Sequence, residues 1–348
     1  MNKNILVLAA VLMVAACNTL ESGNANQDPD AGSGADSSET DNSSTDGSES
    51  KGGSSSINHA DYYVGVDGLA GAELKSVLHD IISTNVTKLT YSEVWTALQY
   101  TDEDPNNTDN VILIYTGRST EKTDRVGQPG DDNDSWNREH MWPKSLGFPD
   151  KSQYGYTDIH HLRPSDVTVN SARGNKAFDN GGAANGEAPD TFTDSDSWEP
   201  RDEVKGDAAR MMFYMDTRYD GSSGNMPDLT LVNNSSSTSG DPAMGVLCTL
   251  LEWHRADAVD EFENRRNDRI QEKQGNRNPF IDNPQWVDSI WGSRCLDSSL
   301  LPKNWGEPMG APAIFEKQIE IKLLHPASTL ESRIQEIEKA IPGNETPD

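Results

Sequence analysis

Three short segments gather the side chains that could carry out hydrolytic chemistry. They cover residues 137–140, which read Asn-Arg-Glu-His, then residues 158–164, and then residues 170–175. Three of the seven histidines of the chain fall within them, as His140, His160 and His161. Carboxylate, amide and guanidinium groups accompany these imidazoles, so the segments together hold acids, bases, oxygen ligands and cations.

Cleavage of a phosphodiester requires these kinds of group. It needs a base that activates water, a cation that neutralises the developing charge, and cationic side chains on the phosphate oxygens. Histidine suits the base near neutral pH, and side-chain oxygens such as those of Glu139 and Asn170 suit a hard ion such as Mg²⁺. Spacing alone leaves two alternatives open, a structural metal site and a polar core cluster.

Residues 137–143 and 158–175 resemble the signature of the endonuclease I family, which comprises secreted and periplasmic nucleases with a ββα-metal active site. The resemblance continues in the same order through four further segments, at 100–107, 199–207, 251–254 and 276–280. It implies an α+β fold with a single nuclease domain that contains a ββα-metal motif. It also implies a largely non-specific endonuclease that cuts DNA, and we expect RNA too, leaving a 5′-phosphate.

The same resemblance assigns roles to three residues. His140 corresponds to the general base, while Glu139 and Asn170 correspond to the ligands of a single metal ion. We expect Mg²⁺, with Ca²⁺ or Mn²⁺ as alternatives. A two-strand hairpin from about His140 to Leu162, followed by a helix starting near Ser165, would bring the three side chains together.

The resemblance does not settle which arginine stabilises the transition state. Arg138, Arg163 and Arg173 are the candidates, since a planar guanidinium suits bidentate phosphate contact. Arg173 ranks first because it would lie one helical turn from Asn170. Each of them could instead form a structural ion pair. We expect His160 and His161 to support the site or pack against it. For a further group of cations we favour ion pairing over a phosphate-facing strip: Arg201, Lys205, Arg265, Arg266 and Arg277.

The elements that must position these groups can be outlined from periodicity. Apolar spacing predicts helices over 72–83, 91–98, 207–219 and 256–274, the second opened by Thr90 and the last ended by Gly275. A short apolar run predicts a buried strand over 111–115. Two polar, glycine-rich stretches, 124–135 and 177–196, predict loops on either side of the candidate site.

The two ends of the chain differ in character from the middle. Residues 1–17 combine an apolar run with Val-Ala-Ala before Cys17, which resembles a lipoprotein signal that leaves a lipid on Cys17. An ordinary signal peptide is the alternative. Residues 18–56 predict a disordered acidic tether, 57–315 the catalytic domain, and 316–348 an extension with a short helix over 328–341. We therefore expect an exported monomer, anchored by lipid to the cell envelope or released outside.

The charge of the chain is the main objection to a nucleic-acid substrate. The formal net charge is −28, and removing the tether leaves about −21 for the remainder. Such acidity argues against a broad basic face. It mildly favours two rivals: a non-enzymatic surface lipoprotein that acts as an adhesin or matrix binder, and a metal hydrolase of another phosphodiester.

Two cysteines remain besides Cys17. In an exported protein, Cys248 and Cys295 are natural partners in a disulfide. Two buried thiols are the alternative, because the sequence does not show whether the pair meets the geometric requirement.

Overall fold

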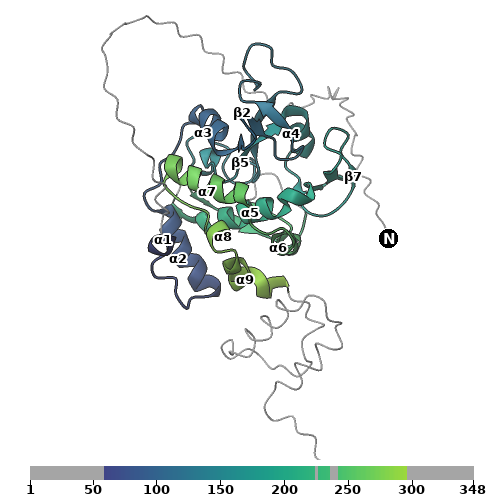
Figure 1. Cartoon of the computed structure of the whole chain (residues 1–348). Coiled ribbons are helices and arrows are strands. Elements are labelled where there is room, and N and C mark those ends of the chain that lie inside the picture. Colours follow the sequence, from purple (N-terminus) through teal and green to yellow (C-terminus); the bar gives the residue numbers. More distant parts are fainter. Residues whose placement is uncertain (1–58, 224–225, 236–241, 296–348) are drawn as a thin grey trace, which may run out of the picture. The chain divides into compact units, whose positions relative to one another are not determined.

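Helix α5 (Lys205–Arg218) lies at the centre of the core, and every residue in it after Lys205 is buried. In a computed structural model, which describes residues 59–223, 226–235 and 242–295, it packs against α2 (Gly71–Ser83) and α6 (Leu247–Ala256) (Figure 1). The predicted helices over 72–83 and 207–219 are confirmed. Residues 1–58 and 296–348, with the predicted signal, tether, domain boundary and C-terminal helix, lie outside the described residues. No helix among the described residues is both long and apolar enough to cross a bilayer.

The remaining helices show how local signals set their ends. Helix α3 (Glu93–Thr101) begins beside a capping box, in which the Thr90 hydroxyl accepts from the Glu93 amide and the Glu93 carboxylate accepts from the Thr90 amide. Helix α7 (Glu261–Gln274) ends at Gly275, whose φ of +93° is left-handed. The expected single helix over 256–274 was wrong at its start, because Ala256 ends α6 and Asp260 caps a separate helix. Three further helices are short: α1 (His59–Tyr62), α8 (Pro279–Asp282) and α9 (Gln285–Trp291).

The strands are short and form several small sheets. A three-stranded sheet contains β1 (Glu103–Asp104), β2 (Asn107–Ile112) and β3 (Ser119–Glu121). The predicted strand over 111–115 was wrong in its bounds, because after Ile112 the chain leaves β2, although Leu113 and Ile114 remain buried. A four-stranded sheet has the order β6 (Ala177–Phe178), β9 (Ser197–Glu199), β8 (Phe192–Thr193), β7 (Ala183–Ala184). The pairs β10 (Asp220–Ser223) with β11 (Met226–Asp228), and β12 (Thr230–Leu231) with β13 (Ala243–Met244), complete an α+β fold, as predicted.

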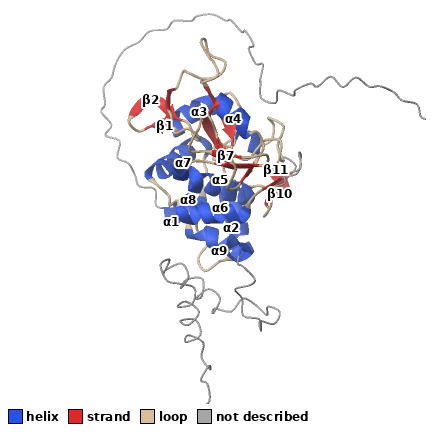
Figure 2. Ribbon diagram, turned by 90° about the vertical axis from the view of Figure 1, so that its right-hand side faces the viewer, coloured by secondary structure: helices blue, strands red, loops and turns tan. Residues whose placement is uncertain are grey.

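The hairpin differs from its predicted bounds. Strands β4 (Trp136–His140) and β5 (Leu162–Asp166) pair antiparallel with His140 opposite Leu162. The strands therefore lie outside the expected span, and residues 141–161 connect them. Helix α4 (Val167–Arg173) follows β5 directly and contacts both strands. Figure 2 shows α3 and α4 at one end of the described part, with α2 and α9 at the other.

The predicted disulfide is confirmed. Cys248, in the first turn of α6, is bonded to Cys295, the last residue of the 3₁₀ helix Gly292–Cys295. Their Cα atoms are 5.4 Å apart, within the usual range for a disulfide. The bond ties the end of the described domain to a helix that packs on α5.

Candidate active site

The candidate site is built where β4, β5 and α4 meet. The side chain of Asp166 accepts hydrogen bonds from the amides of Thr168 and Val169, so it caps α4 immediately after β5. This cap sets the start of the helix two residues after the predicted Ser165. It brings Asn170 and Arg173 over β4, where the pleat turns Asn137 and Glu139 toward one side.

Asn170 is oriented by a second amide. Its Nδ2 donates to Oδ1 of Asn137 at 2.7 Å, and its side chain is almost fully buried. Because the nitrogen is engaged, Oδ1 of Asn170 is the atom left to serve as an acceptor or a ligand. Within the described part of the chain, no hydrogen bond to that oxygen is formed.

Glu139 is held through one of its two oxygens. Oε1 accepts from the Tyr115 hydroxyl at 2.7 Å and lies 3.3 Å from Nη1 of Arg173. Burial raises the pKa of the Glu139 carboxyl, and Arg173 and Tyr115 oppose that rise. The contacts with Tyr115 and Arg173 both fall on Oε1, which leaves Oε2 for a cation.

His140 occupies the last position of β4 with a fixed ring. Its Nε2 lies 3.0 Å from the Tyr156 carbonyl oxygen, which can only accept, so Nε2 carries the proton and Nδ1 is the basic atom. Tyr156 and His161 flank the ring, at 5.1 Å and 5.6 Å between ring centroids. Burial, followed by the neighbouring His161, holds the pKa of His140 well below 6.5. The imidazole is therefore neutral at physiological pH and able to accept a proton.

Arg173 is fully buried and serves the backbone of β4. It donates to the carbonyls of His140 at 3.0 Å and Met141 at 2.6 Å, besides its ion pair with Glu139. These contacts tie the base, the carboxylate and α4 to one another. They favour a positioning role for Arg173 over the phosphate contact for which the sequence ranked it first.

The other two arginine candidates have different surroundings. Arg163 is fully buried and pairs with Asp102 and Asp207, so its charge is neutralised inside the domain. Arg138 is only half-buried and projects from β4 over the rings of Tyr91 and Trp95. Of the three, Arg138 alone is positioned partly at the surface beside His140.

Most of the remaining cations pair with acids, as predicted. The carboxylate partners are Glu203 for Arg201, Glu199 and Asp202 for Lys205, Asp102 for Arg266, and Asp268 and Asp282 for Arg277. Arg265 differs, because it donates to the Glu103 carbonyl.

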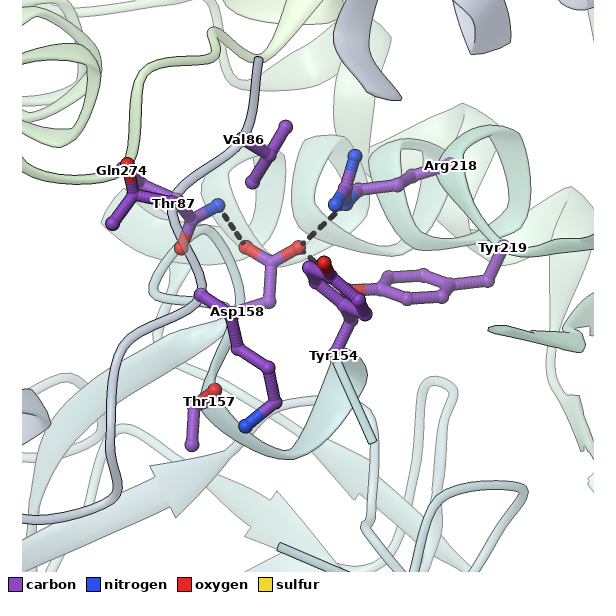
Figure 3. A pocket seen from close by; sticks show the side chains of 9 residues that line it. Val86, Thr87, Tyr154, Thr157, Asp158, Arg218, Tyr219 and Gln274 are labelled. Carbon is purple, nitrogen blue, oxygen red and sulfur yellow. Dashed lines mark hydrogen bonds and ion pairs between the residues drawn. The ribbon is translucent and has the colours of Figure 1, made fainter. Parts of the chain in front are cut away.

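A buried polar network anchors the connection between β4 and β5. The Asp158 carboxylate accepts from Gln274 and Tyr219 and lies 3.2 Å from Nε of Arg218 (Figure 3). The Tyr214 hydroxyl also donates to it. The same carboxylate caps the amide of His160. Burial would raise the pKa of Asp158, but the positive charge of Arg218 is the main effect that outweighs it and lowers the pKa to about 2. Asp158 is thus a buried anion that fixes this segment.

His160 and His161 are held by backbone carbonyls. Nε2 of His160 lies 3.2 Å from the Asn276 oxygen, and Nε2 of His161 lies 2.7 Å from the Gly155 oxygen. Burial lowers the pKa of each ring to about 4. His161 packs beside His140, and both rings are buried, which matches the supporting role expected for them.

The donor set suits a hard, partly hydrated cation. Glu139 offers Oε2 and Asn170 offers Oδ1, both oxygens, and each side chain is fixed through its other polar atom. Nowhere in the described ranges does a group of three His, Cys, Asp or Glu side chains converge as a metal cage. One carboxylate with one amide is the kind of set that Mg²⁺ uses, with water completing its shell.

Three supporting residues were not assigned roles from the sequence. Asn137, Tyr115 and Tyr156 hold Asn170, Glu139 and His140 respectively. Asn137 alone carried a signal, since it lies two positions before Glu139 on the same strand face. Tyr115 and Tyr156 reach the site from other segments, which local spacing does not reveal.

Comparison with known proteins finds one matching family and two relatives. Residues 70–285 match the endonuclease I family. An extracellular ribonuclease from Bacillus subtilis (strain 168) is 55% identical over 231 residues, which cover 66% of this chain and 78% of that protein. An extracellular ribonuclease from Bacillus amyloliquefaciens matches with the same identity and coverage.

Proposed function

This chain belongs to the endonuclease I family and is therefore a nuclease that hydrolyses phosphodiester bonds. We propose that it is an exported, Mg²⁺-dependent enzyme that cuts RNA and DNA at a ββα-metal site. The observation that carries the proposal is the fixed state of three side chains. In each side chain, one polar atom is engaged in a hydrogen bond and another remains for chemistry. The remaining atoms are Oε2 of Glu139 and Oδ1 of Asn170 as metal ligands, and Nδ1 of His140 as the base.

His140 acts as the general base in this account. Nδ1 takes a proton from a water molecule as the water oxygen attacks phosphorus, and the bond from phosphorus to the 3′ oxygen breaks. The Tyr156 carbonyl keeps the proton on Nε2 and steadies the imidazolium that forms. The products carry a 5′-phosphate and a 3′-hydroxyl, the latter protonated from solvent.

Glu139 and Asn170 would hold the cation, whose chemistry when bound is to neutralise charge on the phosphate and the leaving oxygen. Arg173 keeps Glu139 and the His140 backbone in register with α4, so we assign it positioning rather than contact with substrate. Arg138, half-buried on β4, is the arginine that we assign to the phosphate.

The names of the two relatives support RNA as a substrate and an extracellular location. Water is the nucleophile in this mechanism, so the 2′-hydroxyl of RNA is not needed and DNA is cut by the same chemistry. We retain the proposal that Cys17 carries a lipid anchor and that the enzyme works as a monomer. Family membership argues against the rival of a non-enzymatic adhesin or matrix binder.

The nature of the cut ends tests this proposal. We expect the purified mature protein to cleave a labelled RNA and the DNA of the same sequence with Mg²⁺ but not with a chelator. Both substrates should yield 5′-phosphate ends. A 2′,3′-cyclic phosphate on the RNA, with DNA left intact, would show that the 2′-hydroxyl is the nucleophile and would overturn the proposed role of water.

A further inference from the structure

Helix α4, which carries the proposed metal ligand Asn170, is held at both of its ends. At its C-terminal end, Arg173 donates to two backbone carbonyls at and just after the end of β4. At its N-terminal end, Oδ1 of Asp166 accepts from two amides of the first turn. A helix of seven residues has few internal hydrogen bonds, so the contacts at its ends determine where it lies.

The second oxygen of the Asp166 carboxylate is held by Arg118, in the turn between β2 and β3. Nη2 of Arg118 donates to Oδ2 of Asp166 at 2.7 Å and to the Asp134 carbonyl oxygen at 2.5 Å. Nε of the same side chain donates to Oγ1 of Thr120 at 3.2 Å. A planar guanidinium that meets several acceptors at once fixes the position of its carboxylate partner. Arg118 therefore holds the capping side chain of α4 in place.

The loop before β4 joins the same junction. The Asp134 carbonyl accepts from Arg118, and the next carbonyl along the chain, that of Ser135, accepts from the Val167 amide at 3.1 Å. The turn between β2 and β3, the loop before β4 and the first turn of α4 thus meet around one guanidinium.

The position of Asn170 depends on this junction. Asn170 lies four residues after the capping Asp166, and its Nδ2 donates to Oδ1 of Asn137 on β4 at 2.7 Å. That bond requires α4 to keep its distance from β4. If the N-terminal end were released, α4 would be held only through Arg173, and Asn170 would move away from Asn137.

We infer that Arg118 is a positioning residue of the metal site, which acts on the ligand Asn170 through Asp166 and the first turn of α4. This inference rests on the proposed function, because it takes Asn170 as a ligand of the ion. It adds a residue that fixes the site from outside β4 and α4. Glu139 and His140 belong to β4, so loss of Arg118 should weaken binding of the ion and spare the base.

Arg118→Gln tests the inference by direct measurement of ion binding. The probe is Mn²⁺, titrated into the purified protein without substrate and followed by electron paramagnetic resonance. We expect its dissociation constant to rise about 3- to 10-fold, less than the roughly 10- to 100-fold typical of groups that touch a metal ligand directly. The Mg²⁺ concentration for half-maximal cleavage should rise by the same factor, with the rate at saturating Mg²⁺ within about 2-fold of the wild type.

A double-mutant cycle shows whether Arg118 acts through Asn170. Asn170→Ala removes the ligand, so adding Arg118→Gln to it should raise the dissociation constant no further. A further rise equal to that in the wild-type background would overturn the inference, because Arg118 would then act by another route.

Arg255 provides a matched control for the lost charge. It pairs with Asp288, and the side chains of Arg255 and Arg118 are 38% and 41% exposed. Arg255→Gln should leave the dissociation constant for Mn²⁺ unchanged, and a rise equal to that of Arg118→Gln would overturn the inference.

Two further outcomes separate the inference from the proposed function. If Asn170→Ala weakens Mn²⁺ binding and Arg118→Gln does not, the inference is overturned and the proposed metal site stands. If neither Asn170→Ala nor Glu139→Ala weakens it, the proposed metal site fails and the inference fails with it.

Discussion

At the scale of single residues, the candidate site depends on which atom of each side chain is already occupied. The amide nitrogen of Asn170 donates to Asn137, and one oxygen of Glu139 accepts from Tyr115. Nε2 of His140 donates to the Tyr156 carbonyl. Each bond leaves one defined atom for chemistry. Supporting contacts of this kind orient the ligands, and their loss typically costs about 10- to 100-fold in metal affinity or activity.

Asn137 offers the sharpest test of this orientation. Asn137→Leu has a similar size but cannot accept from Asn170, so the amide of Asn170 is free to rotate. We expect the Mg²⁺ concentration for half-maximal activity to rise about 10-fold or more. Asn137→Asp still accepts from Nδ2 and should stay near the wild type. If the Mg²⁺ curves of Asn137→Leu and the wild type coincide, the amide pair does not orient a ligand.

At the scale of elements, the connection between β4 and β5 carries polar groups into the core. His160 and His161 are buried and neutral there, and Asp158 stays ionised because its pKa is about 2. His254 of α6 is buried in the same way, with a pKa of about 4. The segment is long and polar, yet fixed by pairing of its buried groups.

These histidines predict how stability depends on pH. Their pKa in the folded state, about 4, lies below the ordinary value of 6.5, so the unfolded chain takes up protons first. Their contribution to the free energy of unfolding is complete above pH 6.5 and is lost as pH falls from 6.5 to 4. The loss is at most about 3 kcal/mol for each histidine. Urea unfolding across this range should show that fall. His254→Gln should show a smaller fall, and an identical one would contradict its assignment.

The elements also show what the sequence could predict. Helices α2 and α5 have long apolar patterns, and their predicted bounds were within two residues. Helix α7 was started too early because Ala256 ends α6 and the side chain of Asp260, which accepts from the Glu263 amide, caps a separate helix. The strand over 111–115 was misplaced because β2 begins with exposed polar residues, which give no apolar signal.

The site was predictable to a different depth. Resemblance named Glu139, His140 and Asn170, and the structure gathers the elements that carry them around β4. The resemblance did not reveal that Arg173 donates to the backbone carbonyls of His140 and Met141. Helical spacing from Asn170 does not show which groups the Arg173 side chain contacts. Partners from distant segments, such as Tyr115 and Tyr156, likewise depend on the fold.

At the scale of the whole molecule, negative charge predominates, and the buried positive charges are mostly paired with acids. Acidic residues outnumber basic ones by 57 to 29, and most of the buried arginines that we describe are paired with acids. Arg125 and Arg138 lie over the aromatic rings of Trp95 and Tyr91 respectively. An acidic protein can act on a polyanion, provided that the positive charge is concentrated where the substrate binds.

If His140 activates water while Glu139 and Asn170 hold the ion, removal of the imidazole should slow cleavage without changing the requirement for Mg²⁺. Single-turnover rates of RNA cleavage by the wild type and His140→Ala should be compared over a full range of Mg²⁺ concentration. We predict a rate about 10² to 10⁴ lower in His140→Ala at every concentration, with the same half-saturating Mg²⁺, because a positioned base is lost and the ligands remain. A wild-type rate in His140→Ala, or a rate that excess Mg²⁺ restores, would contradict the account.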